Sequence, residues 1–82
     1  MNTVFKYELQ TTDMQVITMP QGSRPLHVAL QNGIPHLWVL VNPENPPEAM
    51  TICVHGTGHA VRPQSEYVGT YEIGPLVFHV FY

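Results

Sequence analysis

The stretch PLHVALQNGIPHLWVLVN, residues 25–42, predicts a β-hairpin. Two strand-like runs flank Asn32-Gly33, and these residues tolerate the positive φ that a two-residue type I′ turn requires. The expected pairs are Gln31 with Ile34, Leu30 with Pro35, Ala29 with His36, Val28 with Leu37, His27 with Trp38 and Leu26 with Val39. One face is then wholly apolar and comprises Leu26, Val28, Leu30, Pro35, Leu37, Val39 and Val41. We expect this face to form the core.

The opposite face of the hairpin is chemically mixed. It carries His27, Ala29, Gln31, Ile34, His36, Trp38 and Leu40. Tryptophan is enriched at the energetic centres of interfaces and histidine supplies polar edges, so His27, His36 and Trp38 are predicted to form a partner interface. Simple cross-strand packing of the tryptophan beside a histidine is the alternative.

The remaining segments also read as strands. Alternating patterns predict strands at Thr3–Leu9, Gln15–Met19 and Met50–His55, and three prolines between residues 42 and 47 predict an exposed loop. Glu66–Ile73 and Leu76–Tyr82 form a second hairpin around Gly74-Pro75. Its expected pairs are Tyr71 with Phe78, Thr70 with His79, Gly69 with Val80, Val68 with Phe81 and Tyr67 with Tyr82.

No segment has a helical period, so the fold class is predicted to be all-β. The last strand, LVFHVFY, is apolar on both faces, which is typical of a central strand or of one covered by a neighbouring subunit. Six to seven short, mainly antiparallel strands with turns between them predict a small sandwich or barrel. The length of 82 residues predicts a single β domain over residues 1–82.

Charge is scarce in this chain. Charged residues make up 11% of the sequence, against about 25% in ordinary soluble domains, which favours a homo-oligomer over a dispersed monomer. The net charge is −3, and Lys6, Arg24 and Arg62 are the only fixed cations. We therefore expect no nucleic-acid partner, because no basic stripe is available for a phosphate backbone.

The expected location is the cytoplasm. Cys53 is the only cysteine, so no intrachain disulfide can form, and the beginning of the chain lacks the pattern of a signal sequence. No apolar run approaches the roughly 20 residues of a membrane span, and no membrane association is expected.

The segment Gly56-Thr57-Gly58-His59, together with Arg62, is predicted to bind a ligand or partner. Backbone N–H groups around glycines form concave anion sites, and Thr57 and His59 add side chains that can hydrogen-bond. A tight turn is the plain alternative. Cys53, His55 and His59 together suggest a metal site, but Gly56 stands where a zinc protease places its glutamate, and we expect neither metal nor cofactor.

No catalytic arrangement is recognisable, so we expect no enzyme activity. Asp13 is the only aspartate, and Ser23 and Ser65 lie outside any nucleophile motif.

The segments FKYEL, HGTGH, EYVGT and LVFHVF, spread over nearly the whole chain, resemble the signature of an uncharacterised domain family found in bacteriophage and bacterial genomes. The resemblance implies a phage or prophage source, and an accessory protein acting in the host cytoplasm. The leading expectation is a self-associating, non-enzymatic β-module that binds and blocks a host protein, in host takeover or against host defence. The alternatives are a sponge that holds a small anionic ligand or signalling nucleotide at Gly56–His59, and a minor virion or assembly component.

Overall fold

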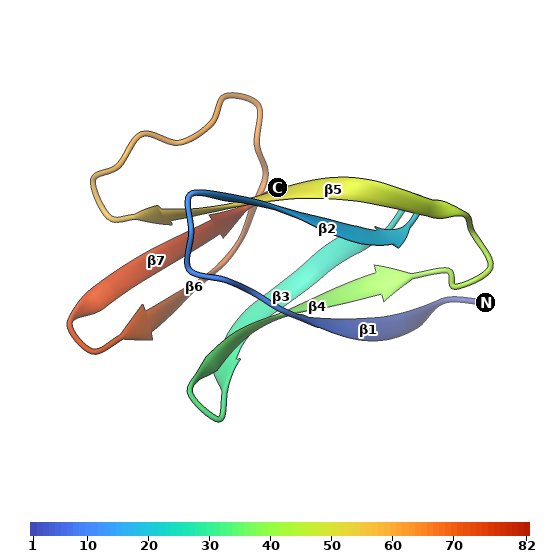
Figure 1. Ribbon diagram of the computed structural model, residues 1–82, viewed down its shortest axis with the longest axis horizontal. Helices are drawn as coiled ribbons and strands as arrows, with labels where there is room; N and C mark the ends of the chain where they lie inside the picture. Colours follow the sequence, from blue (N-terminus) through green and yellow to red (C-terminus); the bar gives the residue numbers. More distant parts are fainter.

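The structure, a computed structural model, describes all 82 residues and consists of seven strands without a helix (Figure 1). The strands are β1 (Thr3–Glu8), β2 (Met14–Pro20), β3 (Arg24–Gln31), β4 (Ile34–Val41), β5 (Pro47–Gly56), β6 (Tyr67–Ile73) and β7 (Leu76–Phe81). All pairings are antiparallel. The chain therefore has the predicted all-β fold.

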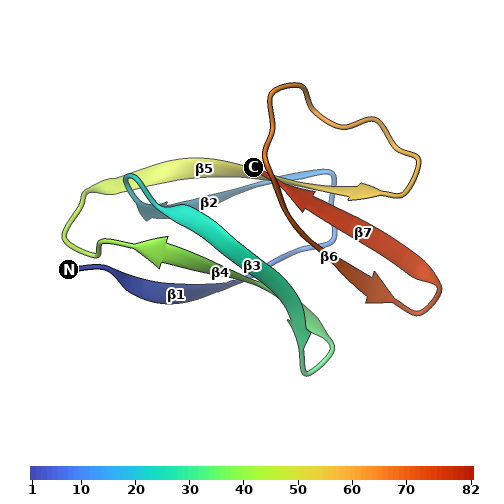
Figure 2. The ribbon, with the colours of Figure 1, turned by 180° about the vertical axis from the view of Figure 1, so that it is seen from behind.

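Two sheets form the layers of a small sandwich. Sheet A has the strand order β1-β4-β3, and sheet B has the order β2-β5-β7-β6 (Figures 1 and 2). The chain crosses between the sheets after β1, β2 and β4, whereas β3–β4 and β6–β7 are hairpins within one sheet. The last strand, β7, lies inside sheet B, which confirms the prediction of a central strand.

The β3–β4 hairpin has the predicted turn. Asn32 and Gly33 have φ values of 54° and 76°, as a type I′ turn requires. The predicted pairs from Gln31–Ile34 to His27–Trp38 are confirmed. The pair Leu26–Val39 was wrong, because a β-bulge at Leu26 places Pro25 opposite Val39 instead.

The bulge also changes which residues reach the core. Five of the seven residues of the predicted apolar face are buried, namely Val28, Pro35, Leu37, Val39 and Val41. Leu26 and Leu30 were wrongly assigned to the core, since their exposed fractions are 44% and 41%. Leu26 is the extra residue of the bulge, and Leu30 lies one pair from the turn, where the hairpin tip extends away from sheet B (Figure 1).

The β6–β7 hairpin follows the same pattern. The pairs nearest the turn, Tyr71–Phe78, Thr70–His79 and Gly69–Val80, are confirmed, and Gly74 has a positive φ of 57°. The outer pairs were wrong. A second bulge at Val68 places Tyr67 opposite Phe81, in place of the predicted pairs Val68–Phe81 and Tyr67–Tyr82.

The proline-rich loop is shorter than predicted. β5 begins at Pro47, which pairs with Pro20 at the end of the β2–β5 ladder, where a missing N–H is tolerated. The loop is also tied to its neighbour, because the Asn45 side-chain amide donates to the Gln21 carbonyl at 2.9 Å.

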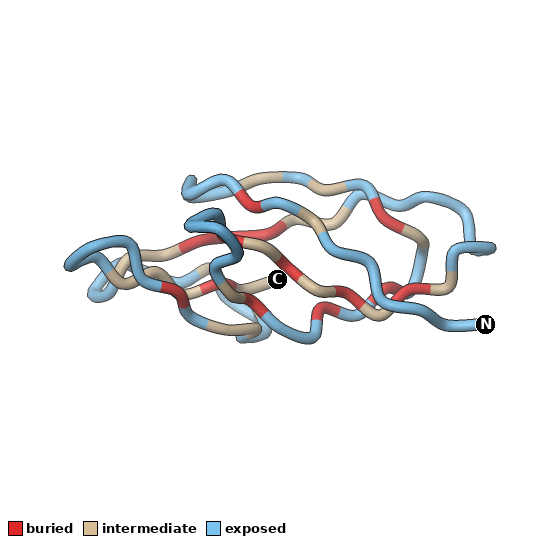
Figure 3. The backbone as a smooth tube through the Cα atoms, turned by 90° about the horizontal axis from the view of Figure 1, so that it is seen from below, coloured by how far each residue is buried: buried red, intermediate tan, exposed pale blue.

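The core lies between the two layers (Figure 3). Leu37, Val39 and Val41 of β4 are completely buried and pack with Ile52 and Val54 of β5, Val80 of β7 and Tyr71 of β6. Each fully buried aliphatic side chain stabilises the fold by about 1.5–3 kcal/mol. The structure contains no helix with the length and apolarity needed to cross a membrane.

Candidate functional site

Residues 57–66 form an arch that joins β5 to β6 (Figure 1). These two strands are not neighbours, because β7 lies between them in sheet B. Along β5, Ile52 and Val54 point into the core, so Cys53 and His55 lie on the outer face of sheet B. Cys53 is nevertheless buried, with an exposed fraction of 1%. Cys53 lies at one side of a hollow whose other lining includes arch residues 59–63.

The arch begins with a tight turn over Gly56–His59, the segment that was predicted to bind a ligand or partner. Gly58 has φ +90°, and the His59 amide donates to the Gly56 carbonyl at 3.1 Å. The His59 ring lies over Gly56, where an added Cβ would be 3.2 Å from the ring carbon Cε1. The His59 amide is already used by the turn and is not an open anion donor.

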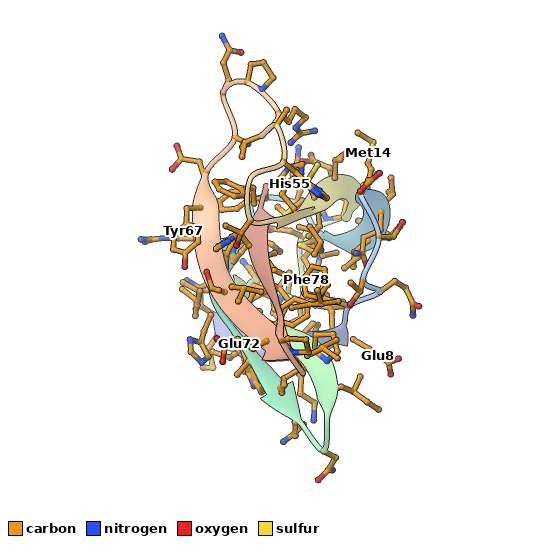
Figure 4. The ribbon with its side chains drawn as sticks, turned by 90° about the vertical axis from the view of Figure 1, so that its left-hand side faces the viewer. Glu8, Met14, His55, Tyr67, Glu72 and Phe78 are labelled. Atoms are coloured by element: carbon orange, nitrogen blue, oxygen red, sulfur yellow. The ribbon has the colours of Figure 1, made fainter.

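Thr57 is anchored to the sheet. Its hydroxyl is hydrogen-bonded to Nε2 of His79 at 2.8 Å, and Nδ1 of the same ring is 3.0 Å from the hydroxyl of Thr70. Thr70 is in turn 2.6 Å from the Tyr67 hydroxyl. This chain of side chains runs over the outer face of sheet B, on which Tyr67 points away from the core (Figure 4).

The Thr57–His79 pair has the spacing of a nucleophile and its general base. The group on the far ring nitrogen is the neutral hydroxyl of Thr70, however, whereas a catalytic triad places a carboxylate there to stabilise the imidazolium. The geometry therefore favours a structural role, in which Thr57 holds the start of the arch against β7.

The hollow beneath the arch has a volume of about 470 Å³. Asp13 and Met14 line it from the start of β2, Cys53 and His55 from β5, and residues 59–63 from the arch. Figure 4 shows His55 below the arch, with Met14 on the neighbouring strand. Nε2 of His55 is buried without a hydrogen-bond partner. No three His, Cys, Asp or Glu side chains, including Cys53, His55 and His59, are grouped closely enough to hold a metal ion.

A second hollow, of about 520 Å³, lies at the other side of His59. Gly56 and Thr57 line it together with residues 75–78, and His59 belongs to both hollows. The structure thus brings His59 and Arg62 together in the first hollow, places Gly56 and Thr57 in the second, and leaves Gly58 in neither.

The predicted interface residues lie together on the outer face of sheet A. The Trp38 ring has the His27 ring at 5.8 Å and the His36 ring at 6.0 Å. His36 is held in place, because its Nδ1 hydrogen-bonds to the Ile34 carbonyl at 2.8 Å. We call this surface the Trp38 face; it consists of Val4, Lys6 and Glu8 of β1, Arg24, His27, Ala29 and Gln31 of β3, and Ile34, His36, Trp38 and Leu40 of β4.

Two tyrosines have clearly shifted acidities. Burial raises the pKa of Tyr7. Burial also raises the pKa of Tyr71, and the hydrogen bond of 2.7 Å between its hydroxyl and that of Thr11 offsets part of this rise. Tyr71 belongs to the core cluster and Tyr7 packs against it, and both lie outside the two hollows and the Trp38 face.

The family model described as Domain of unknown function (DUF7352) matches residues 1–82. The chain belongs to this family. The DUF7352 match spans all seven strands, and hence the arch and the Trp38 face alike. No match was found among curated proteins or among solved structures.

In this DUF7352 domain, the sequence did not identify several residues of the first hollow and of the polar cluster on the outer face of sheet B. Met14 and Asp13 reach the hollow only because β2 pairs with β5, a contact between distant segments. His79 and Thr70 were correctly paired across the second hairpin, and this pairing was a usable signal for a polar cluster on the outer face. Nothing in the sequence indicated that Thr57 would join it.

Proposed function

We propose that the protein is a non-enzymatic binding module whose Trp38 face docks onto an acidic surface of another protein. The observation that supports this proposal most is that the Trp38 ring lies beside the rings of His27 and His36 on the outside of sheet A. A half-buried tryptophan held by its neighbours offers a large contact area with little conformational entropy to lose on binding. Aliphatic residues of the same face, Val4 and Ile34, are 50% and 42% exposed and extend the apolar contact.

The charges of the Trp38 face support an acidic partner. Lys6 and Arg24, two of the three fixed cations, lie on this face, whereas Glu8 is its only acidic residue out of six in the chain. The face is therefore cationic on a protein whose net charge is −3. Complementary charge steers association and discriminates between partners, so an acidic surface is favoured over a basic one.

The proposed partner is a host protein, which the module blocks in the cytoplasm of an infected bacterium. The support is the resemblance of FKYEL, HGTGH, EYVGT and LVFHVF to domains of bacteriophage genomes. The non-enzymatic part of the proposal is supported by the site, in which the His79 ring is hydrogen-bonded to the hydroxyls of Thr57 and Thr70 and to no carboxylate.

We further propose that the module self-associates through the free edge of β2. Sheet edges are usually guarded by charges, bulges or covering segments. β2 is an edge strand without a charged residue between Met14 and Pro20, and Met14 and Val16 are 58% and 62% exposed. By contrast, β1 carries Lys6 and Glu8 at the edge of sheet A. A second copy of β2 would pair with this edge and extend sheet B.

The docking proposal is tested with tagged protein in extract of the bacterial host, with bound chains identified by mass spectrometry. Four proteins are compared: wild type, Trp38→Ala, Arg24→Glu and, as a matched control outside the Trp38 face, Arg62→Glu. We expect wild type and Arg62→Glu to retain one acidic host protein that is released by raised salt, and both Trp38-face variants to lose it. Retention of the same protein by Trp38→Ala would overturn the proposal.

A further inference from the structure

The hollow beneath the arch contains polar groups that lack partners within the protein. Nε2 of His55 is buried and makes no hydrogen bond, although buried polar atoms are almost always paired. Arg62 makes no ion pair, since the single ion pair of the chain joins the N-terminus to Glu44. Arg62 is half-buried and lines the hollow together with His55, whose Nε2 lies beneath the accessible surface. The hollow lies on the opposite side of the sandwich from the Trp38 face.

The balance of charge in the hollow favours an anion. Arg62 is its only fixed cation and Asp13 its only acid, and the two do not form an ion pair with each other. His59, which is exposed, adds an imidazole that can hydrogen-bond an oxyanion as a donor. Arginine in turn binds carboxylates and phosphates through paired charge-assisted hydrogen bonds.

The remaining lining determines what accompanies the oxyanion. Met14, Cys53 and Val61 present thioether, thiol and aliphatic groups to the hollow. A free inorganic ion would leave this apolar part in contact with water, whereas a ligand with a hydrocarbon or aromatic body would cover it. The volume of about 470 Å³ lies within the range of small-molecule sites, about 300–1,000 Å³.

We propose that this hollow is a binding site for a small organic oxyanion, with Arg62 and His59 holding a carboxylate or phosphate head group and Met14 and Val61 covering its apolar body. His55 lines the base of the hollow, below the head group. The site is independent of docking at the Trp38 face, so either proposal can fail without the other.

The test is a titration followed by amide chemical shifts in nuclear magnetic resonance spectra. Three probes share one aromatic ring: benzoate, phenyl phosphate and, as the uncharged control, benzyl alcohol. At millimolar concentration and neutral pH we expect at least one of the two anions to shift the amides of His55 and residues 59–62. The anion that binds more tightly shows whether the site prefers a carboxylate or a phosphate head group. Binding of benzyl alcohol as tight as that of both anions would overturn the proposal, as would an absence of shifts at the arch with all three probes.

Two arginine variants make the test specific. Arg62→Gln keeps most of the side-chain stem and removes the charge, and we expect about tenfold weaker binding of the preferred anion, equivalent to about 1.4 kcal/mol. Arg24→Gln is the matched control, because Arg24 lies on the Trp38 face, and it should bind as wild type does. Arg62 does not belong to the core cluster, so we expect Arg62→Gln to fold as wild type does. The dispersion of its amide chemical shifts checks this. Equal affinity of wild type and Arg62→Gln would overturn the assignment of the site.

Discussion

Gly69 of β6 lies directly against Val28 of β3, so closely that a Cβ added at Gly69 would be 3.2 Å from the Val28 Cβ and 3.4 Å from the Val28 backbone nitrogen. This contact brings the edge strands of the two sheets together. A Cβ at this position would require Val28 to move by a few tenths of an ångström. At the other side of the sandwich, β1 and β2 are joined through the chain but do not pair, and both edges remain open.

We expect Gly69→Ala to lower the free energy of unfolding by about 1–3 kcal/mol, because a buried backbone neighbour must move to admit the methyl group. Gly56→Ala is the matched control. Its methyl group would meet the ring of His59, an exposed and adjustable side chain, so we expect a loss below about 1 kcal/mol. Urea unfolding of both variants measures the difference. A larger loss for Gly56→Ala would contradict the role of Gly69 in joining the sheets.

The type I′ turn leads to a second prediction. Gly33→Val should lower the free energy of unfolding by about 1–3 kcal/mol, because Gly33 has φ +76° and a β-branched residue resists this conformation. No atom lies within 4 Å of the added Cβ, so the effect is one of backbone conformation alone. Thr12→Val, at an exposed loop position, is the control and should change stability little. Equal melting temperatures of the two variants would refute the turn type.

Buried tyrosines predict a loss of stability in alkaline solution. The pKa of Tyr71 is raised in the folded protein, mainly by burial, so above about pH 10 the unfolded chain releases its phenol protons first. The contribution of Tyr71 to stability should be constant below this pH and should be lost as the pH rises through the folded-state pKa. Urea unfolding between neutral pH and pH 11 measures the slope. Tyr71→Phe should reduce this slope, and a slope equal to that of wild type would contradict the prediction.

The anchor of the arch is tested by Thr57→Val, which keeps the side-chain shape and removes the hydrogen bond to His79. We expect faster amide hydrogen exchange across residues 57–66 and a loss of about 0.5–1.5 kcal/mol in the free energy of unfolding. Thr18→Val is the control, because Thr18 is exposed on the outer face of β2. Unchanged exchange in the Thr57 variant would show that the arch is held by other contacts.

Self-association predicts a mass above 9.2 kDa in light scattering at micromolar concentration. Val16→Lys places a charge on the open β2 edge and should shift the protein towards the monomer. Val61→Lys is the control, since Val61 is similarly exposed, at 46%, but lies in the arch. A wild-type mass equal to that of one chain would contradict self-association. A mass unchanged in the Val16 variant would place the contact elsewhere.

The accuracy of the sequence-based pairings depended on distance from the turns. Pairs within a few residues of Asn32-Gly33 and Gly74-Pro75 were correct, because each turn sets the register of its own neighbours. The errors began at the bulges at Leu26 and Val68. A bulge adds one extra residue to one strand, at a place set by how the two sheets pack. The alternation of apolar and polar residues along the strand does not indicate where that place is.

The sequence by itself determined the all-β fold class, both hairpin turns, the central position of LVFHVF and the grouping of His27, His36 and Trp38, because each depends on local alternation and turn chemistry. Only the tertiary structure decided that β2 pairs with β5, that Gly69 meets Val28, and that the arch lines a hollow together with Asp13, Cys53 and His55. These contacts join segments far apart in the chain, and their energies depend on how two complete sheets pack together. No local pattern specifies them.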